Sequence, residues 1–155
     1  MIKKIASVLL ILLWMFIIFS FSGDTGETSG GLTEEIIVKV TTTLTDIKEG
    51  TKEMQDVIDK WMFPTRKAAH YFVYFVLAFL IMNTLFIMGV KRHTLIITGI
   101  ICIFYAMSDE YHQTFVSGRT GQISDVLLDS SAALISAFLY HRFILMRFYR
   151  EKKSN

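Results

Sequence analysis

The chain has 155 residues, of which 52% are hydrophobic, with a single Pro and a mean hydropathy of +0.45. This composition is too apolar for a water-soluble domain of the same size and predicts a membrane protein whose first partner is the lipid bilayer. The formal net charge of +2 argues against nucleic acid binding, because the basic residues cluster beside apolar segments instead of forming one stripe.

The first apolar run extends over about residues 5–22 and follows Lys3 and Lys4. A helix needs about 20 apolar residues to cross a bilayer core, so this run predicts a first span. A signal peptide is the alternative, since residues 20–22 resemble a small-x-small cleavage site. The run exceeds the roughly 7 to 15 apolar residues of a signal-peptide core, and we therefore expect the helix to be retained.

An amphipathic insert follows at about residues 29–63, after a Gly- and Ser-rich stretch. Its apolar residues repeat at steps of three and four, which places them on one helical face. Gly50 is expected to divide the insert into two helices. A helix of this kind lies on the membrane surface or caps the bundle, so we interpret it as a lid, with a passive spacer as the alternative. The predicted apolar stripe consists of Val40, Leu44, Ile47, Met54, Ile58 and Trp61.

Three further spans are predicted at about residues 68–90, 94–111 and 123–146. The short connection at 91–93 makes the second and third spans an antiparallel hairpin. Four spans place both termini on one side of the membrane, and the Lys and Arg clusters next to the spans mark that side as cytoplasmic. The sequence therefore predicts one all-α membrane domain over residues 1–155, with the insert outside the cytoplasm.

Charged and polar side chains interrupt the apolar spans at the ends that this topology brings to the outer face. Charges beside hydrocarbon are costly unless they are paired or hydrated, and they often mark a functional site. We expect the bundle to collect them in one polar site, with Asp109 and His112 as secondary members. The candidate ligand-binding residues are Arg66, Lys67, His70, Tyr74, Asp109, Glu110, His112, Gln113, Arg119, Asp125 and Asp129.

Three stretches resemble the VanZ-like family, namely "FSFSG", "RKAAHYFVYFVLAFL" and "YAMSDEYHQTFVSGRTGQISDVLLD". The founding member of that family is associated with resistance to the glycopeptide antibiotic teicoplanin. The resemblance implies a multi-pass protein of the bacterial cytoplasmic membrane that lowers glycopeptide susceptibility, and it implies no particular reaction. Ser117 stands where relatives often have Pro, and Ser131 and Ala132 where they often have Gly.

Three hypotheses for the polar residues remain open at this point. In the first, Arg66, Lys67 and Arg119 donate hydrogen bonds to the phosphate of an anionic lipid or a peptidoglycan-precursor head group. In the second, the charges only fix helix packing, with Arg119 paired to Asp125 or Asp129 and Arg66 paired to Glu110.

The third hypothesis is a hydrolase or transferase acting on a phospholipid or polyprenyl-phosphate head group. Its catalytic candidates offer imidazole and carboxylate groups, which suit one divalent metal or a general acid and base. No H-E-x-x-H or G-x-S-x-G motif supports a known mechanism of this kind. The sequence leaves the cofactor, the ligand and the oligomeric state open. The catalytic candidates are His70, Glu110, Asp125 and Asp129.

Overall fold

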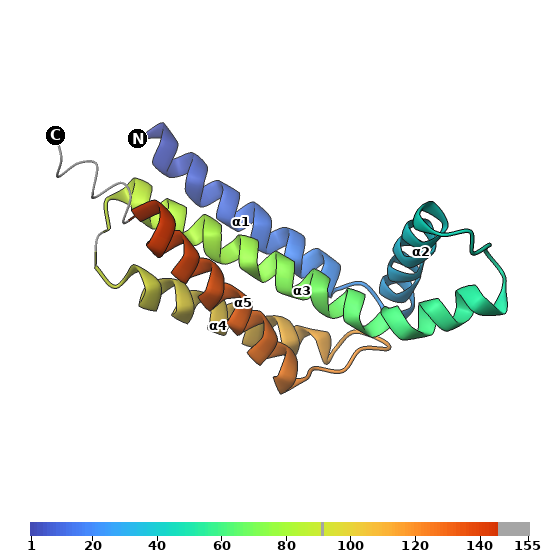
Figure 1. Ribbon diagram of the computed structural model, residues 1–155. Coiled ribbons are helices and arrows are strands. Elements are labelled where there is room, and N and C mark those ends of the chain that lie inside the picture. The colour runs from blue at the N-terminus through green and yellow to red at the C-terminus, as the bar shows by residue number, and fades with distance from the viewer. Residues whose placement is uncertain (91, 146–155) are drawn as a thin grey trace.

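The computed structural model describes residues 1–90 and 92–145, and every regular element in these residues is a helix (Figure 1). Four of the helices are long and apolar enough to cross a membrane, and an additional helix lies between the first and second of them. The predicted all-α membrane fold is therefore confirmed. The predicted end of the fourth span at residue 146 lies outside the described residues. The elements are α1 (Ile2–Ser22), α2 (Gly26–Leu44), α3 (Lys52–Met88), α4 (Thr94–Gln113), α5 (Ile123–Tyr140) and the π-helix η1 (His141–Leu145).

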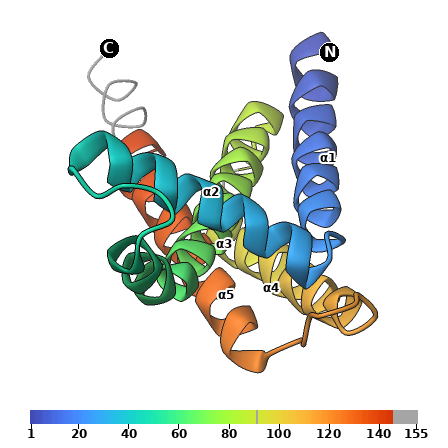
Figure 2. The same cartoon turned by 90° about the vertical axis from the view of Figure 1, so that its right-hand side faces the viewer.

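The spanning helices α1, α3, α4 and α5 form one bundle, with α2 outside it. The start of α1 and the end of α5 lie at the same end of the bundle, whereas α2 lies across the opposite end (Figures 1 and 2). The outer surface of the bundle is apolar, with side chains such as Leu9, Phe16, Phe104 and Phe138 exposed. Such a surface suits contact with lipid tails, which are as apolar as the side chains themselves.

In the interior of the bundle, small side chains from α4 and α5 pack against larger ones from α3, such as Leu77 and Ile81. Ala78, Cys102, Ala106 and Ala132 are fully buried between the helices, and the large Tyr74 is buried beside them. Small residues allow helix backbones to approach closely. Lipid tails are as apolar as the side chains, so the hydrophobic effect does not drive spans together, and close packing does so instead. The bundle therefore packs through shape complementarity.

Two hydrogen bonds attach α1 to the other spans. The indole N–H of Trp14 donates to the backbone oxygen of Val73 in α3 at 2.9 Å. The hydroxyl of Tyr105 in α4 donates to the backbone oxygen of Met15 at 2.5 Å. Trp and Tyr each combine an apolar ring with one polar atom. The ring packs against neighbouring side chains while the polar atom forms a hydrogen bond. These contacts hold the middle of α1 against the middle of α3 and the second half of α4.

The second span differs from the prediction, because α3 is one helix of 37 residues and does not begin at residue 68. It runs through Pro64 and joins half of the insert to the span. Proline removes one intrahelical hydrogen bond and bends a helix without ending it, and Figure 1 shows that α3 changes direction. At 1.5 Å per residue, α3 is about 55 Å long, so it projects well beyond a hydrocarbon core of about 30 Å.

The insert is a pair of helices, α2 and the first turns of α3, as predicted from Gly50. Gly50 has a φ of +75° in the connection between them, a conformation that glycine adopts without strain. Ile37 from α2 packs against Met54 and Ile58 from α3 in a small buried cluster. The insert therefore has a core of its own.

The predicted single apolar stripe of the insert is wrong in part. Val40, Leu44 and Trp61 are 51%, 77% and 50% exposed, although they fit the same helical period as the buried Met54 and Ile58. The helical period restarts after the turn at Gly50, so Val40 and Leu44 in α2 do not continue the face of Met54 and Ile58 in α3. The turn does not explain the exposure of Trp61, which belongs to α3.

The loop at residues 114–122 lies tightly against the end of α4. A Cβ atom on Gly121 would lie 2.5 Å from the backbone oxygen of Glu110 and 2.8 Å from Cγ2 of Thr114. The same loop accepts a hydrogen bond at the Ser117 oxygen from the backbone N–H of Gly26, at 3.1 Å, which ties α2 to it. Gly121 is thus required for the close approach of loop and helix.

We expect Gly121→Ala to lower the free energy of unfolding by about 1–3 kcal/mol, because the added methyl group must displace helix backbone. Gly30→Ala is the matched control, since no atom lies within 4 Å of its added Cβ in α2. It should raise helix stability by about 0.5–1 kcal/mol. Thermal unfolding of the detergent-solubilised variants, followed by circular dichroism, measures both. Equal unfolding temperatures for the two variants would contradict the packing described.

Candidate functional site

A cavity of about 290 Å³ opens between α3, α5 and the loop at 114–122. We call it the loop-side cavity. Its lining is rich in charged and amide side chains, which come from three separate parts of the chain. The convergence of the predicted polar residues is therefore observed for the members that line it: Arg66, Lys67, His70, Gln113, Arg119 and Asp125.

A second cavity, of about 300 Å³, lies under α2, and we call it the α2-side cavity. Its polar side is formed by Arg66, His70, Asp109 and Arg119. Three of these side chains, those of Arg66, His70 and Arg119, also line the loop-side cavity. The remaining wall is largely apolar, and α1, α2 and α3 contribute Ile18, Phe21, Leu32, Ile36 and Val73 to it.

His70, Glu110 and Asp129 come together at these cavities, one from each of α3, α4 and α5, and of the three only His70 lines the cavities. Each offers a nitrogen or oxygen atom that lies within 4.8 Å of those of the other two. Nδ1 of His70 lies 3.7 Å from Oδ2 of Asp129. Glu110 is only 4% exposed and Asp129 is fully buried. We call these residues the His–Glu–Asp cluster.

A chain of hydrogen bonds fixes Glu110 in this cluster. The Gln113 amide donates to Oε1 of Glu110 at 3.2 Å, and the backbone N–H of Gln122 donates to Oε2 at 2.9 Å. The Gln113 oxygen in turn accepts from Nη1 of Arg119 at 3.4 Å. The Glu110 carboxylate is thus oriented by α4 and by the following loop together.

Arg119 connects this chain to the end of α1. Its Nε donates to the backbone oxygen of Asp24 at 3.0 Å, and its Nη2 donates to that of Phe21 at 3.2 Å. Burial, followed by the positive charge of Arg66, lowers the pKa of the Arg119 guanidinium. An arginine stays charged at neutral pH despite such a shift. Two positive charges therefore share one cavity wall.

The ion pairs differ from those of the packing hypothesis. Arg119 pairs with neither Asp125 nor Asp129, since it bonds to Gln113 and to backbone oxygens; Asp125 pairs instead with Lys67. The predicted pair of Arg66 and Glu110 is also not formed. Across residues 1–90 and 92–145, Arg66 has no hydrogen bond and no ion pair. Helix spacing places charges at one depth, but the path of the loop decides which of them meet.

Asp109 and Tyr74 lie next to the cluster in buried positions. Asp109 is 3% exposed and Tyr74 is fully buried. Within the described residues, the two carboxylate oxygens of Asp109 and the hydroxyl of Tyr74 have no hydrogen-bond partner. The hydroxyl of Ser22, which also lines the α2-side cavity, is in the same condition. Several buried polar atoms without a hydrogen-bond partner therefore occur in this part of the bundle.

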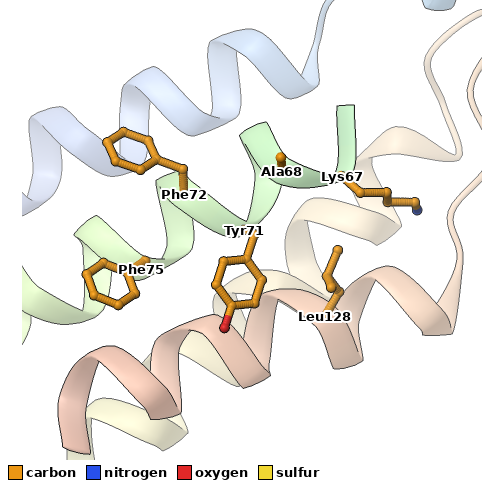
Figure 3. A pocket seen from close by; sticks show the side chains of 6 residues that line it. All are labelled: Lys67, Ala68, Tyr71, Phe72, Phe75 and Leu128. Carbon is orange, nitrogen blue, oxygen red and sulfur yellow. The ribbon is translucent and has the colours of Figure 1, made fainter. Parts of the chain in front are cut away.

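A third depression is an apolar groove of about 610 Å³ between α3 and α5 (Figure 3). We call it the α3–α5 groove. Its only charged lining residue among those described is Lys67, which also lines the loop-side cavity. The groove thus adjoins the polar cavity at one lysine. The other lining residues are Ala68, Tyr71, Phe72, Phe75 and Leu128.

The sequence model of a protein family described as VanZ/LLP1 matches residues 7–146. The chain belongs to this family. Comparisons with curated proteins and with solved structures give no match. The predicted VanZ-like resemblance is therefore confirmed, and the matched range includes every residue of the two cavities in this VanZ family protein.

One predicted site residue lies apart from the others. His112 lines neither cavity, and its ring packs against Phe19 of α1 with centroids 4.3 Å apart. Successive residues of a helix are about 100° apart, so His112 and the cavity-lining Gln113 face different neighbours. The three-residue spacing from Asp109 suggested a shared face, but the packing of α4 against α1 takes His112 away from the site.

Several residues of the site were not predicted from the sequence, among them the cavity-lining Asp24 and Asp59. Ser22 ends α1 and lines the α2-side cavity, and Gln122 supplies the backbone N–H that binds Glu110. Both occur within the stretches that resemble the VanZ-like family, so a signal for them was present. Neither side chain is charged, and a search for charges beside apolar runs does not find them.

We expect Arg119→Lys to destabilise the VanZ family protein by about 1–3 kcal/mol, because lysine keeps the charge but its donors share one nitrogen, which cannot reach the three acceptors that Nε, Nη1 and Nη2 of Arg119 contact. Arg66→Lys should leave stability unchanged, since Arg66 has no partner in the described part of the chain. Thermal unfolding of both variants in the same detergent tests this difference. If Arg119→Lys unfolds at the wild-type temperature, Arg119 does not connect the elements as described.

Proposed function

We propose that this VanZ family membrane protein binds the phosphate-bearing head group of a lipid-linked envelope component between Arg66 and Arg119. The observation that carries the proposal is the state of Arg66, whose guanidinium lines both cavities beside Arg119 and has no partner among the described residues. Two guanidinium groups at one cavity repel each other, and a bound anion offsets that repulsion. Their planar donor groups match the oxygen geometry of phosphate.

The apolar surfaces next to the cavities support an amphiphilic ligand over a free anion. The α2-side cavity has an apolar wall beside its polar side, and the α3–α5 groove begins at Lys67 (Figure 3). An acyl or polyprenyl chain fits an apolar groove of this kind, with its phosphate held at the polar end. Lys67 adds a further positive charge there, although Asp125 already pairs with it.

The proposed location is the bacterial cytoplasmic membrane, with both termini in the cytoplasm. Lys3 and Lys4 lie in the first turn of α1, and Arg92 lies in the connection between α3 and α4, all at the end of the bundle opposite α2. The positive-inside rule makes that end cytoplasmic. The cavities then open to the outer face, where glycopeptides meet lipid-linked precursors, and binding or modifying such a precursor would contribute to resistance of the teicoplanin type.

A second candidate function is a hydrolase or transferase acting on the same head group. The observation that favours it is the His–Glu–Asp cluster, which places an imidazole within a few ångströms of two carboxylates and next to the cationic cavity. Such groups act as general acid and base, or bind a metal, in enzymes of this chemistry. Binding alone leaves the lipid unchanged, whereas this function alters it.

We expect Arg66→Gln to weaken binding of a polyprenyl phosphate by about 10- to 100-fold. This factor corresponds to the loss of one charge-assisted hydrogen bond, which contributes about 1.5–3 kcal/mol. Arg92→Gln is the control, because it makes the same change of charge at an exposed residue at the opposite end of the bundle. Titration of purified protein, followed by native mass spectrometry, compares the phosphate with the neutral polyprenol. Equal affinity of both variants, or of both lipids, would refute the proposed site.

We expect expression of the wild-type chain to raise the teicoplanin concentration needed to inhibit a susceptible bacterium, and Arg66→Gln to abolish this rise. Immunoblotting of membranes ensures that both variants are present in equal amounts. Mass spectrometry of envelope lipids from the same cells separates the two candidate functions. An altered lipid that appears only with the wild type supports the enzyme, and unchanged lipids support the binder.

A further inference from the structure

We propose that His70, Glu110 and Asp129 bind one divalent metal ion of the zinc or manganese class. The inference goes beyond head-group binding and does not rest on it, because Glu110 and Asp129 line neither cavity, and Arg66 and Arg119 are not ligands of the ion. Each residue comes from a different helix, α3, α4 or α5, so the site is assembled by the bundle. An ion there would join the three helices.

The first argument is the charge of the buried region. Asp109, Glu110 and Asp129 are all at most 4% exposed, and within residues 1–90 and 92–145 none of them pairs with a lysine or an arginine. Lys67 is paired with Asp125, and the Arg119 guanidinium bonds to Gln113 and backbone oxygens. A protonated His70 offsets only one carboxylate. Buried carboxylates without compensation are strongly destabilising, and a dication removes that penalty.

The second argument is the condition of Asp129. Its side chain is fully buried, and neither of its oxygens has a hydrogen-bond partner in the described part of the chain. Nδ1 of His70, 3.7 Å away, is likewise without a hydrogen bond. Buried polar atoms are almost always satisfied in folded proteins, so a nitrogen and two oxygens that face each other unsatisfied indicate a ligand.

The chemistry of the three ligands suits a transition metal. One imidazole nitrogen with two carboxylates is a set that zinc and manganese accept, whereas calcium and magnesium prefer oxygen ligands alone. Three protein ligands leave at least one coordination position for water or for a phosphate oxygen, as in catalytic zinc sites. Glu110 already has the supporting contacts typical of a metal ligand, from the Gln113 amide and the Gln122 backbone.

The cluster is slightly wider than a metal requires. Ligands on one ion are roughly 3 to 3.5 Å apart, compared with the limit of 4.8 Å observed here. Small side-chain rotations of His70 and Asp129 close this difference, because no hydrogen bond holds either group at its metal-facing atoms. Glu110 is the fixed ligand, and the other two move toward it.

The test uses tag-free protein, purified in detergent, stripped with EDTA and dialysed against Zn²⁺ or Mn²⁺ without added lipid. Elemental analysis should give about one ion per chain, and the ion should raise the unfolding temperature of the wild type. Asp129→Asn, Glu110→Gln and His70→Gln should each weaken binding by more than about tenfold. Asp56→Asn, which removes an exposed carboxylate from α3, should bind the ion like the wild type.

Two further measurements separate a metal ligand from a merely structural residue. In EDTA, Asp129→Asn should unfold at or above the wild-type temperature, because it removes an uncompensated buried charge. Electron spin-echo spectroscopy of the Mn²⁺ form should show coupling to an imidazole nitrogen, which His70→Gln removes. Absence of saturable binding of both ions to the wild type would overturn the proposal, whatever the variants do. Wild-type affinity in all three ligand variants would overturn it equally.

The outcome for the metal is distinguishable from the outcome for the head group. Metal binding is measured without lipid, and polyprenyl phosphate binding depends on Arg66, which is not a ligand of the ion. A protein that binds Zn²⁺ or Mn²⁺ but not the phosphate supports the metal centre alone. A protein that binds the phosphate in EDTA but neither ion overturns the metal centre and leaves the head-group site in place.

Discussion

The architecture of the polar end depends on the contacts of one guanidinium group. Arg119 donates to backbone oxygens at the end of α1 and, through Gln113, orients Glu110 between α4 and α5. Carbonyl groups at the C-terminal end of a helix have no partner within the helix, and a cation satisfies them in both charge and geometry. Because one side chain serves acceptors in three segments, the loop, the first span and the buried carboxylate take up their positions together.

The polar end holds charges of both signs close together. Arg66 and Arg119 line the cavities together with the carboxylates of Asp109 and Asp125, whereas Glu110 and Asp129 are buried and line neither cavity. In a medium of low dielectric constant, such charges interact more strongly than they do in water. The proposed phosphate and the proposed metal ion therefore have neighbouring but separate positions.

The sequence predicted the spans and the gathering of polar residues, because both follow from depth in the membrane. Apolar length sets which residues lie in hydrocarbon, and helical connectivity sets which span ends are neighbours. It did not predict the partner of Arg119 or the separate position of His112, since these depend on helix rotation and on the loop path. The change in composition near Pro64 predicted a break between insert and span, but the helix α3 continues through it. The roles of the gathered residues remain predictions.

The continuous α3 joins the insert to the polar end through unbroken helix. Arg66, Lys67 and His70 follow Pro64 within two helical turns, and Met54 and Ile58, which pack against α2, precede it in the same helix. A proline is the point at which a helix bends most readily, because one intrahelical hydrogen bond is missing there. The direction in which the arm projects from the membrane is therefore set only a few residues before the side chains that line the cavities.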